Sequence, residues 1–230
     1  MLQKNDFIEL EFLGRVKGGD IFDTNIQEEA KKINLELETR PLIICLGQNM
    51  ILPAIDEFLA GKETGKYTLE LEPEKAFGLR DRNLIKTMPI KIFLEKQVYP
   101  RPGMIFEFDN VIGRISAVSG GRVIVDFNHP LANKVAVYEL NVKSVISDDT
   151  EKVSSLMRFF FRRKFDFEIK EKKLIIKSEA KLKPLFELFK GKFKEILDLD
   201  LEFQEEEKKE EKSEDKKPEI PEKTQEKTEK

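Results

Sequence analysis

The sequence predicts an α+β protein in which antiparallel sheets dominate and a second, smaller α+β unit follows. Three observations support this fold class. Through residue 147 the apolar residues mostly alternate with polar ones in short runs that turn residues separate, as in antiparallel strands. Helical periodicity is limited to short stretches until residues 182–197, which form one longer amphipathic pattern. The last residues, 205–230, are mostly charged.

Composition narrows the classes of function. The chain has 230 residues, of which 40% are hydrophobic and 37% charged, well above the roughly 25% charged residues of ordinary globular chains. Lysine and glutamate dominate the charged set, a bias typical of proteins from hot environments. The formal net charge is only -3, so the chain lacks the basic surplus of nucleic-acid-binding proteins. We therefore expect no nucleic-acid partner.

Cysteine usage and hydropathy predict a cytoplasmic protein. The single cysteine, Cys45, lies within the apolar run 42–46 and is interpreted as a buried small hydrophobe. One cysteine allows no internal disulfide, which suits a reducing compartment. The first residues lack the apolar core of a signal peptide, and no apolar run approaches the roughly 20 residues that span a bilayer. We expect no membrane partner.

The first part of the chain, to residue 83, is predicted to form strands around one short helix. Strands are expected at 7–12, from Pro41 to 47, and at 67–72, with a helical turn at 27–34 in a connecting loop. A second helix is expected at 53–60, because Pro53 is tolerated in a first turn and Gly61 ends the pattern. Ile55, Phe58 and Leu59 form its apolar face.

Residues 84–128 are predicted to form a small β-rich unit of their own. Strands are expected at 104–108, 111–118 and 122–127, joined by turns at Asp109-Asn110 and Gly120-Gly121, and a further strand at 135–142 follows. The unit holds more apolar residues than so small a core can bury comfortably. They are Ile105, Phe106, Phe108, Val111, Ile112, Ile115, Val118 and Val123. The pattern does not tell which of them are exposed.

After Thr150 an independent α+β domain is predicted at 150–204. It comprises a helix at 153–161, a hairpin of strands 165–169 and 174–177, the helix at 182–197 and a last strand at 199–203. The mixture of aromatic and basic residues at 157–164 is interpreted as helix core with solvated charges. The segment 205–230 cannot bury enough apolar surface to offset its chain entropy, so it is predicted to be disordered.

No conventional catalytic set is present. The sequence has one histidine, His129, and lacks a phosphate-binding loop, a dinucleotide fingerprint and paired cysteines. We expect neither a metal nor a cofactor. His129 is interpreted as a hinge residue with a local hydrogen bond. An active site in this chain would be built mainly from apolar side chains.

Four stretches, in this order, resemble the FKBP family of peptidyl-prolyl cis/trans isomerases. They are Phe12–Gly14 with Gly19–Thr24, Leu46–Glu57, Ala76–Gly78 and Val137–Leu140. The segments 72–78 and 126–134 resemble the SlyD branch, in which a chaperone domain is inserted into the isomerase domain. The resemblance covers about residues 4–147, and the C-terminal addition resembles that of long-chain archaeal FKBPs.

This resemblance implies a half-barrel sheet around a short helix, made of residues 1–83 and 129–148, with 84–128 as the inserted domain. It also implies a hydrophobic slot for proline. Four positions would act in catalysis, namely Phe12, Asp23, Phe77 and Tyr138. Five would bind the substrate, namely Phe22, Leu42, Ile51, Leu52 and Ile55. Ile55 would be the pocket floor, the Leu52 N–H would donate to a substrate carbonyl, and Asp23 would be the carboxylate at the rim.

The chain departs from the family pattern at three positions. Phe12 and Phe77 stand where tyrosines are usual, and Ala54 stands where glycine is usual. We expect the apolar wall, and with it a weakened isomerase, to persist. The expected partners are unfolded or proline-containing polypeptides, captured on the inserted domain. The alternatives are a holdase that binds proline segments without turnover, and an interaction protein that pairs as a homodimer through the C-terminal domain.

Overall fold

The computed structural model describes residues 1–36, 42–108 and 110–205. It confirms the α+β class with mainly antiparallel sheets. Parts of three expectations lie outside the described residues, namely the start of a strand at Pro41, the turn at Asp109 and the tail from 206 onward. The chain divides into two compact units, Met1–Lys164 and Phe165–Lys230.

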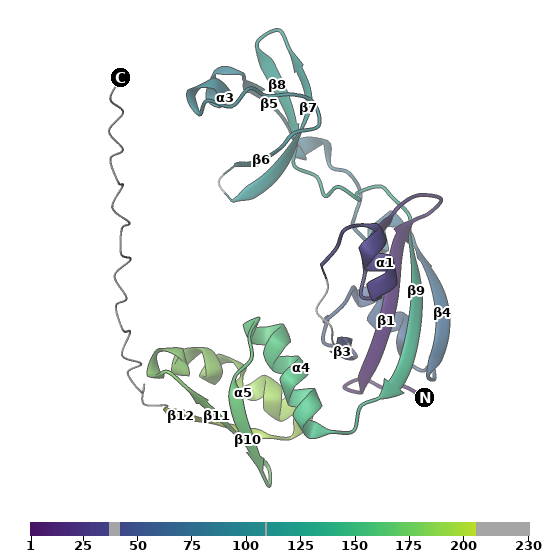
Figure 1. Ribbon diagram of the computed structural model, residues 1–230, viewed down its shortest axis with the longest axis vertical. Coiled ribbons are helices and arrows are strands. Elements are labelled where there is room, and N and C mark those ends of the chain that lie inside the picture. The colour runs from purple at the N-terminus through teal and green to yellow at the C-terminus, as the bar shows by residue number, and fades with distance from the viewer. Residues whose placement is uncertain (37–41, 109, 206–230) are drawn as a thin grey trace, which may run out of the picture. The chain divides into compact units, whose positions relative to one another are not determined.

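A five-stranded antiparallel sheet forms the body of the first unit (Figure 1). Its strands are β1 (Phe7–Val16), β2 (Ile21–Thr24), β3 (Leu42–Cys45), β4 (Gly65–Leu71) and β9 (Ala136–Val145). The order is β2-β1-β9-β4, and β3 also pairs with β1. The expected strands are thus present, and β1 and β9 extend several residues beyond their predicted ends because they pair with each other along most of their length.

One face of this sheet carries the core of the body. Alternate residues of β1 and β9, among them Leu10 and Leu140, are buried with Ile55 and Leu59 of helix α2 (Pro53–Leu59). Helix α1 (Gln27–Lys32) and the short 3-10 turns η1 (Pro73–Lys75) and η2 (Arg82–Leu84) lie in connections. Because side chains alternate along a strand, the charged residues of β1 and β9 lie on the other face.

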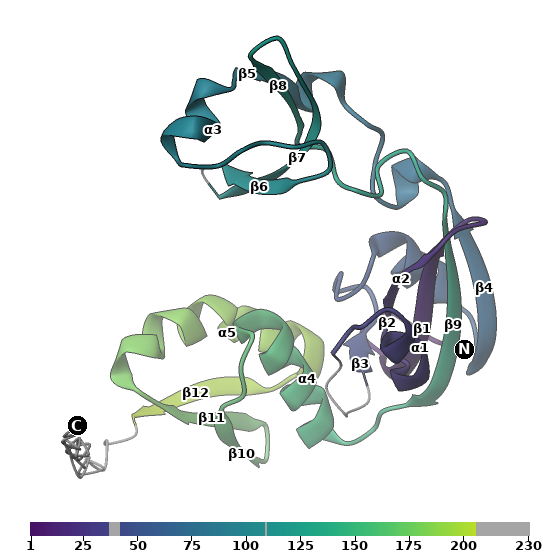
Figure 2. The same ribbon diagram turned by 45° about the horizontal axis from the view of Figure 1, so that its top comes forward.

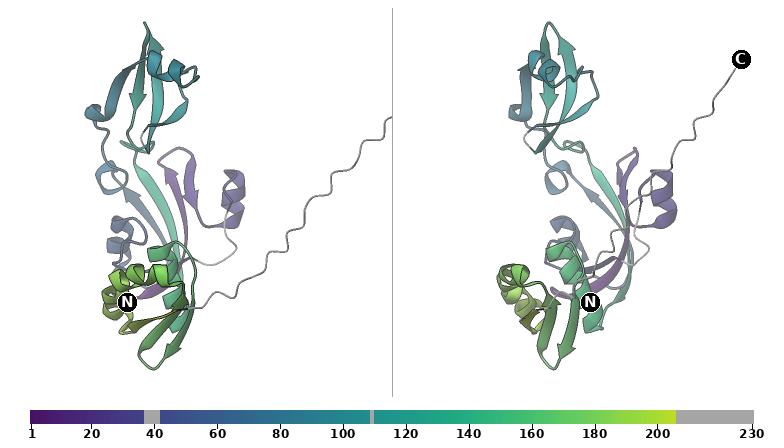
Figure 3. Two further views of the ribbon diagram at one scale, coloured as in Figure 1. Left: turned by 90° about the vertical axis from the view of Figure 1, so that its left-hand side faces the viewer. Right: turned by 60° about the vertical axis from the view of Figure 1, so that its left-hand side comes forward.

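The inserted residues form a four-stranded antiparallel sheet in the order β5-β8-β7-β6. Its elements are β5 (Ile85–Pro89), α3 (Lys91–Glu95), β6 (Ile105–Phe108), β7 (Val111–Ser119) and β8 (Arg122–Asp126). Helix α3 lies against this sheet (Figure 3), and its Phe93 is buried with Ile115, Val123 and Val125 in a separate small core. Three strands are as expected, whereas β5 and α3 were not predicted.

Helix α4 (Asp149–Phe161) belongs to the first unit, although the sequence places the C-terminal domain at 150–204. The Asp148 carboxylate caps it by accepting the Glu151 N–H at 2.9 Å. The buried Ser155 hydroxyl donates to the carbonyl of Ile43 in β3 at 2.6 Å. Helix α4 thus packs on the five-stranded sheet, a contact over 112 residues of sequence that local patterns do not encode.

The second unit is a three-stranded sheet with one helix. It comprises β10 (Asp166–Lys170), β11 (Lys173–Ser178), η3 (Ala180–Leu182), α5 (Lys183–Leu197) and β12 (Asp200–Glu205). Helix α5 covers one face of the sheet (Figure 2) and returns the chain so that β12 pairs parallel to β11. The predicted hairpin, helix and last strand are all present. No helix among the described residues combines the length and apolar composition that crossing a membrane requires.

Candidate active site

An apolar cavity of about 620 Å³ lies between the five-stranded sheet of the first unit and loops that connect its strands. It is lined by Phe12, Phe22, Asp23, Leu42, Met50, Ile51, Leu52, Phe77, His129, Pro130, Leu131 and Tyr138. All of the site residues expected from the sequence, except Ile55, line this cavity. Ile55 is fully buried in the core and does not face the cavity.

Aromatic rings build the wall of this cavity, which we call the prolyl pocket after the slot for proline that the sequence resemblance implies. Phe22 of β2 meets two rings edge-on, Phe77 at a centroid distance of 5.3 Å and Tyr138 at 5.7 Å. The ring of Phe12 lies 6.3 Å from that of Tyr138. Gly14 makes this packing possible, because a Cβ there would lie 2.9 Å from both Phe22 and Tyr138. The Gly14 of the sequence motif therefore serves the aromatic wall.

Asp23 is the one carboxylate among the residues that line the prolyl pocket. It stands at the exposed rim. Partial burial raises the pKa of Asp23, and the backbone N–H of Thr24 opposes that rise. Burial also raises the pKa of the Tyr138 phenol, and the nearby Asp23 charge adds to it. At neutral pH Tyr138 is therefore a neutral hydroxyl close to the Asp23 carboxyl group.

The loop 46–52 supplies the opposite wall through Met50, Ile51 and Leu52. Asp56 of α2 holds this loop, because its Oδ2 accepts the Asn49 N–H at 3.1 Å. Only 6% of Asp56 is exposed, and its Oδ1 is buried without a hydrogen-bond partner among the described residues. Burial raises the pKa of this carboxyl, and the backbone N–H groups of Asn49 and Gly47 oppose that rise. Asp56 was not predicted as a site residue from the sequence.

His129 has the local hydrogen bond expected of it and a second contact that was not expected. Its Nδ1 accepts the Leu131 N–H at 3.2 Å. Its ring stacks on Phe77 with a centroid distance of 4.7 Å and an interplanar angle of 1°. His129, Pro130 and Leu131 thereby line the prolyl pocket. The signal for them was the motif at 126–134, which was noted as a connection and not as a wall.

Hydrogen bonds tie together the two chain segments that lead into and out of the insert. The Arg80 N–H donates to the Asn133 side chain at 2.8 Å, and its guanidinium binds the Asp126 carboxylate. The Asn128 side chain accepts the Asp81 N–H at 2.7 Å and donates to the Asp81 carbonyl at 2.9 Å. Burial alone would raise the pKa of Asp126. The hydrogen bonds from Asn128 and the charge and hydrogen bond of Arg80 hold this pKa below its usual range.

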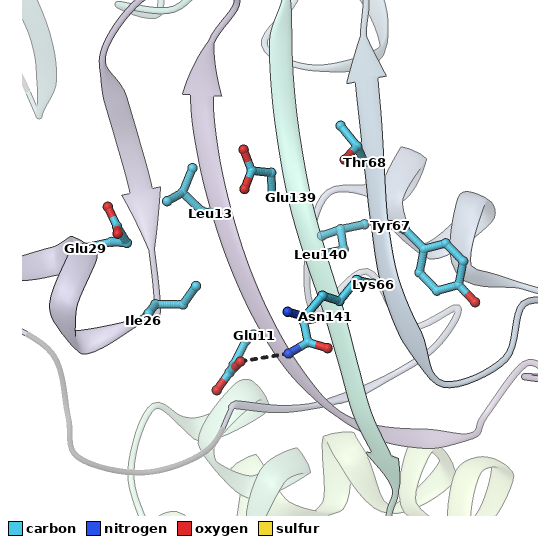
Figure 4. A pocket seen from close by; sticks show the side chains of 10 residues that line it. All are labelled: Glu11, Leu13, Ile26, Glu29, Lys66, Tyr67, Thr68, Glu139, Leu140 and Asn141. Carbon is cyan, nitrogen blue, oxygen red and sulfur yellow. Dashed lines mark hydrogen bonds between the residues drawn. The ribbon is translucent and has the colours of Figure 1, made fainter.

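A second hollow, of about 400 Å³, lies on the charged face of the body (Figure 4). Its carboxylates Glu11 and Glu139 bind neighbouring polar side chains. Glu11 accepts from Asn141 at 3.0 Å and from Lys143 at 3.0 Å, and Glu139 pairs with Arg15. None of the expected site residues lines this hollow. In the part of the chain that the structure describes, no three His, Cys, Asp or Glu side chains converge as metal ligands would.

Comparisons with known proteins agree with this geometry. Residues 86–131 match the family model described as FKBP26, IF domain. A short-type peptidyl-prolyl cis-trans isomerase of Methanocaldococcus jannaschii is 30% identical over 155 residues, which cover 66% of this chain and 98% of that protein. An FKBP-type peptidyl-prolyl cis-trans isomerase SlyD of Aeromonas hydrophila is 25% identical over 150 residues, which cover 64% of this chain and 66% of that protein. A 16 kDa FKBP-type isomerase of Escherichia coli K12 is 30% identical over 112 residues, covering 46% of this chain and 74% of its own.

The fold, the aromatic pocket and these relatives define a peptidyl-prolyl cis-trans isomerase. The chain belongs to the FKBP family and carries the inserted domain of that family's FKBP26 and SlyD members. The resemblance seen in the sequence is thereby confirmed.

Proposed function

We propose that the protein isomerises X-Pro bonds in the prolyl pocket and captures unfolded chains on the inserted domain. The observation that carries the first part is the cavity of about 620 Å³ whose walls are apolar and aromatic except for Asp23 at the rim. Such a cavity fits a proline ring. It offers no nucleophile and needs none for this reaction.

The chemistry of the prolyl bond explains why such a pocket is sufficient. Resonance in the planar amide sets a barrier of about 18–20 kcal/mol. At the twisted transition state this resonance and its charge separation are lost, so the twisted amide is less polar than either planar isomer. A dry apolar site therefore favours the transition state over both ground states.

Three polar groups orient the substrate in this proposal. The Leu52 N–H, for which the described residues provide no acceptor, donates to a substrate carbonyl. The Asp23 carboxylate and the Tyr138 hydroxyl face the twisting amide at the rim. Phe12 and Phe77 have no hydroxyl to add, so turnover is modest. Phe22, Leu42 and Ile51 hold the proline ring, while Ile55 supports them from the core.

The inserted sheet provides the capture surface in this proposal. Of its apolar residues, Ile115 and Val123 are buried, whereas Ile105 is 70%, Ile112 66% and Val111 53% exposed. Ile105 pairs with Arg114 and Ile112 with Glu107, so Ile105 and Ile112 are diagonal neighbours on one face of β6 and β7. Exposed apolar side chains grouped in this way mark an interaction surface. β6 is also an edge strand, and no described strand pairs with its outer side.

Capture and catalysis in one chain raise the local concentration of prolyl bonds at the pocket. The clients are unfolded or proline-containing polypeptides. We also propose the bounds predicted from the sequence for the isomerase body and the insert, a cytoplasmic location, and pairing through the C-terminal domain. The alternative is a holdase that binds without turnover, and the missing hydroxyls of Phe12 and Phe77 favour it.

Refolding of a protein limited by prolyl isomerisation, compared with a short proline peptide, tests the proposal. Polar replacement at the capture surface, with I105S and I112S together, should lower kcat/KM on the refolding protein by about tenfold and leave the peptide unchanged. L188S, which alters an equally exposed residue of α5, is the control. Equal effects on both substrates would refute capture at this surface. Acceleration of neither substrate by the wild type would leave only the holdase.

A further inference from the structure

A third cavity adjoins the prolyl pocket at the base of the insert. It has a volume of about 610 Å³ and shares two wall residues, His129 and Pro130, with the prolyl pocket. We call it the hinge cleft. Its charged lining consists of Arg80, Arg114, Lys134 and Asp126. A polypeptide that occupies the prolyl pocket can therefore continue past His129 into a cavity of different character.

The hinge cleft carries surplus positive charge. Arg80 and Asp126 neutralise each other in an ion pair, and Asn128 also donates to the Asp126 carboxylate at 2.7 Å. Arg114 lies opposite Asp126 in the pairing of β7 with β8, but that carboxylate is already engaged. Among the described residues neither Arg114 nor Lys134 has an ion-pair partner within 4.0 Å. Two unpaired cations thus face the cleft.

The prolyl pocket has the opposite charge character. It contains one carboxylate, Asp23, and no cation. An acidic side chain of a bound peptide would be repelled by Asp23 and attracted by Arg114 and Lys134. His129, whose ring stacks on Phe77 of the prolyl pocket, lines both cavities. The surface therefore distinguishes a proline position from a neighbouring acidic position.

We propose that the hinge cleft is a subsite for a carboxylate of the polypeptide whose proline occupies the prolyl pocket. This inference rests on the proposed isomerase function and adds a substrate preference to it. The carboxylate belongs to an aspartate or glutamate near the proline or to the chain terminus. Because an extended chain advances about 3.3 Å per residue, positions within about four residues of the proline reach the adjoining cavity.

A peptide series tests this subsite. Each peptide has blocked ends, one central proline and either Glu or Gln at a single position, which lies up to four residues before or after the proline. A separate pair of peptides differs only in having a free or an amidated C-terminus. Exchange is measured by NMR at low and high salt with the full-length protein. At one or more positions Glu should raise kcat/KM by about threefold to tenfold over Gln, and salt should reduce this ratio.

Charge variants assign the effect to the cleft. R114Q and K134Q together should bring the Glu-to-Gln ratio close to one, and K134E should favour Gln. R122Q, which removes a cation of β8 outside both cavities, should keep the wild-type ratio. A ratio near one at every position in the wild type, or a ratio that survives the double variant, would overturn the subsite. If no peptide is isomerised, the proposed function fails. The ratio of the Kd values of the Glu and Gln peptides then decides the subsite alone.

Discussion

Two carboxylates beside the prolyl pocket show how individual residues shape it. Asp23 and Asp56 both have a raised pKa because their surroundings remove water. Their tasks differ, since Asp23 stands at the rim whereas Asp56 is buried and holds the loop of Met50, Ile51 and Leu52 through the Asn49 N–H. An ionised, incompletely paired carboxylate inside the protein lowers stability. Asp56 therefore links the shape of the pocket wall to pH.

Replacing Asp56 by Asn should change how stability depends on pH. The folded-state pKa of Asp56 lies above the unfolded value of about 3.9, so the folded state binds the proton more tightly. The contribution of Asp56 to the free energy of unfolding is greatest below about pH 4 and is lost as the pH rises through the folded pKa. The wild type should thus gain stability relative to D56N on acidification from neutrality toward about pH 4.

Urea unfolding followed by circular dichroism across this pH range measures the difference. Asp23 is present in both proteins, so its contribution to the pH dependence cancels in the difference. Carboxyl groups with lowered pKa values, such as Asp126, act at lower pH. A constant difference between wild type and D56N would contradict the account.

Single residues of the site were predictable to the extent that a motif contains them. Phe22, Asp23 and Tyr138 stand in stretches whose order resembles a known pocket, and the structure brings them together. Met50 and Leu131 reach the pocket because loops fold over it. The place of Asp56 depends on the backbone of a loop seven residues away, which spacing alone does not reveal.

At the scale of elements, helix α4 shows how an edge strand is protected. Among the described strands β3 pairs with β1 alone, so none of them pairs with its other side. The Ser155 hydroxyl satisfies the Ile43 carbonyl there, and Val153, Leu156 and Met157 are buried in the same helix. Covering an edge prevents pairing with other chains. Helix α4 is therefore part of the isomerase body as folded.

Removing the Ser155 hydroxyl should destabilise this docking. S155A leaves the buried Ile43 carbonyl without its donor and should lower the free energy of unfolding of the first unit by about 1–3 kcal/mol. The neighbouring S154A is the matched control and should change it by less than about 0.5 kcal/mol. Chemical denaturation of the two variants makes the comparison. Equal effects would show that the hydrogen bond to β3 does not hold the helix.

The elements themselves were largely predictable, and their packing was not. Strands with clear alternation, such as those at 67–72 and 122–127, are present. β5 was missed because it ends in Pro89, and α3 because its five residues are too short for helical periodicity. Sorting Ile105 from Ile115 required the register of β6 with β7, which fixes the face of each side chain.

At the scale of the molecule, the chain joins an apolar, aromatic pocket to an inserted sheet that carries exposed apolar side chains. The inserted sheet is reached and left through residues 79–84 and 127–134, and the bonds of Asn128 to Asp81 and of Asn133 to Arg80 link these two crossings. This link places the wall residue His129 next to the insert. The crossing thus supplies part of the site as well as the connection.

The central claim is that the prolyl pocket isomerises X-Pro bonds. NMR exchange spectroscopy of a short X-Pro peptide, with and without catalytic amounts of protein, tests it most directly. We predict clear acceleration, reduced about tenfold by D23A or Y138F, because each removes one hydrogen-bonding group from the rim. E29A, in the hollow on the other face of the sheet, should leave the rate unchanged. Absence of acceleration would contradict the claim and leave a protein that only binds its clients. Rates in D23A and Y138F equal to that of the wild type would contradict it as well, because the reaction would then not depend on this pocket.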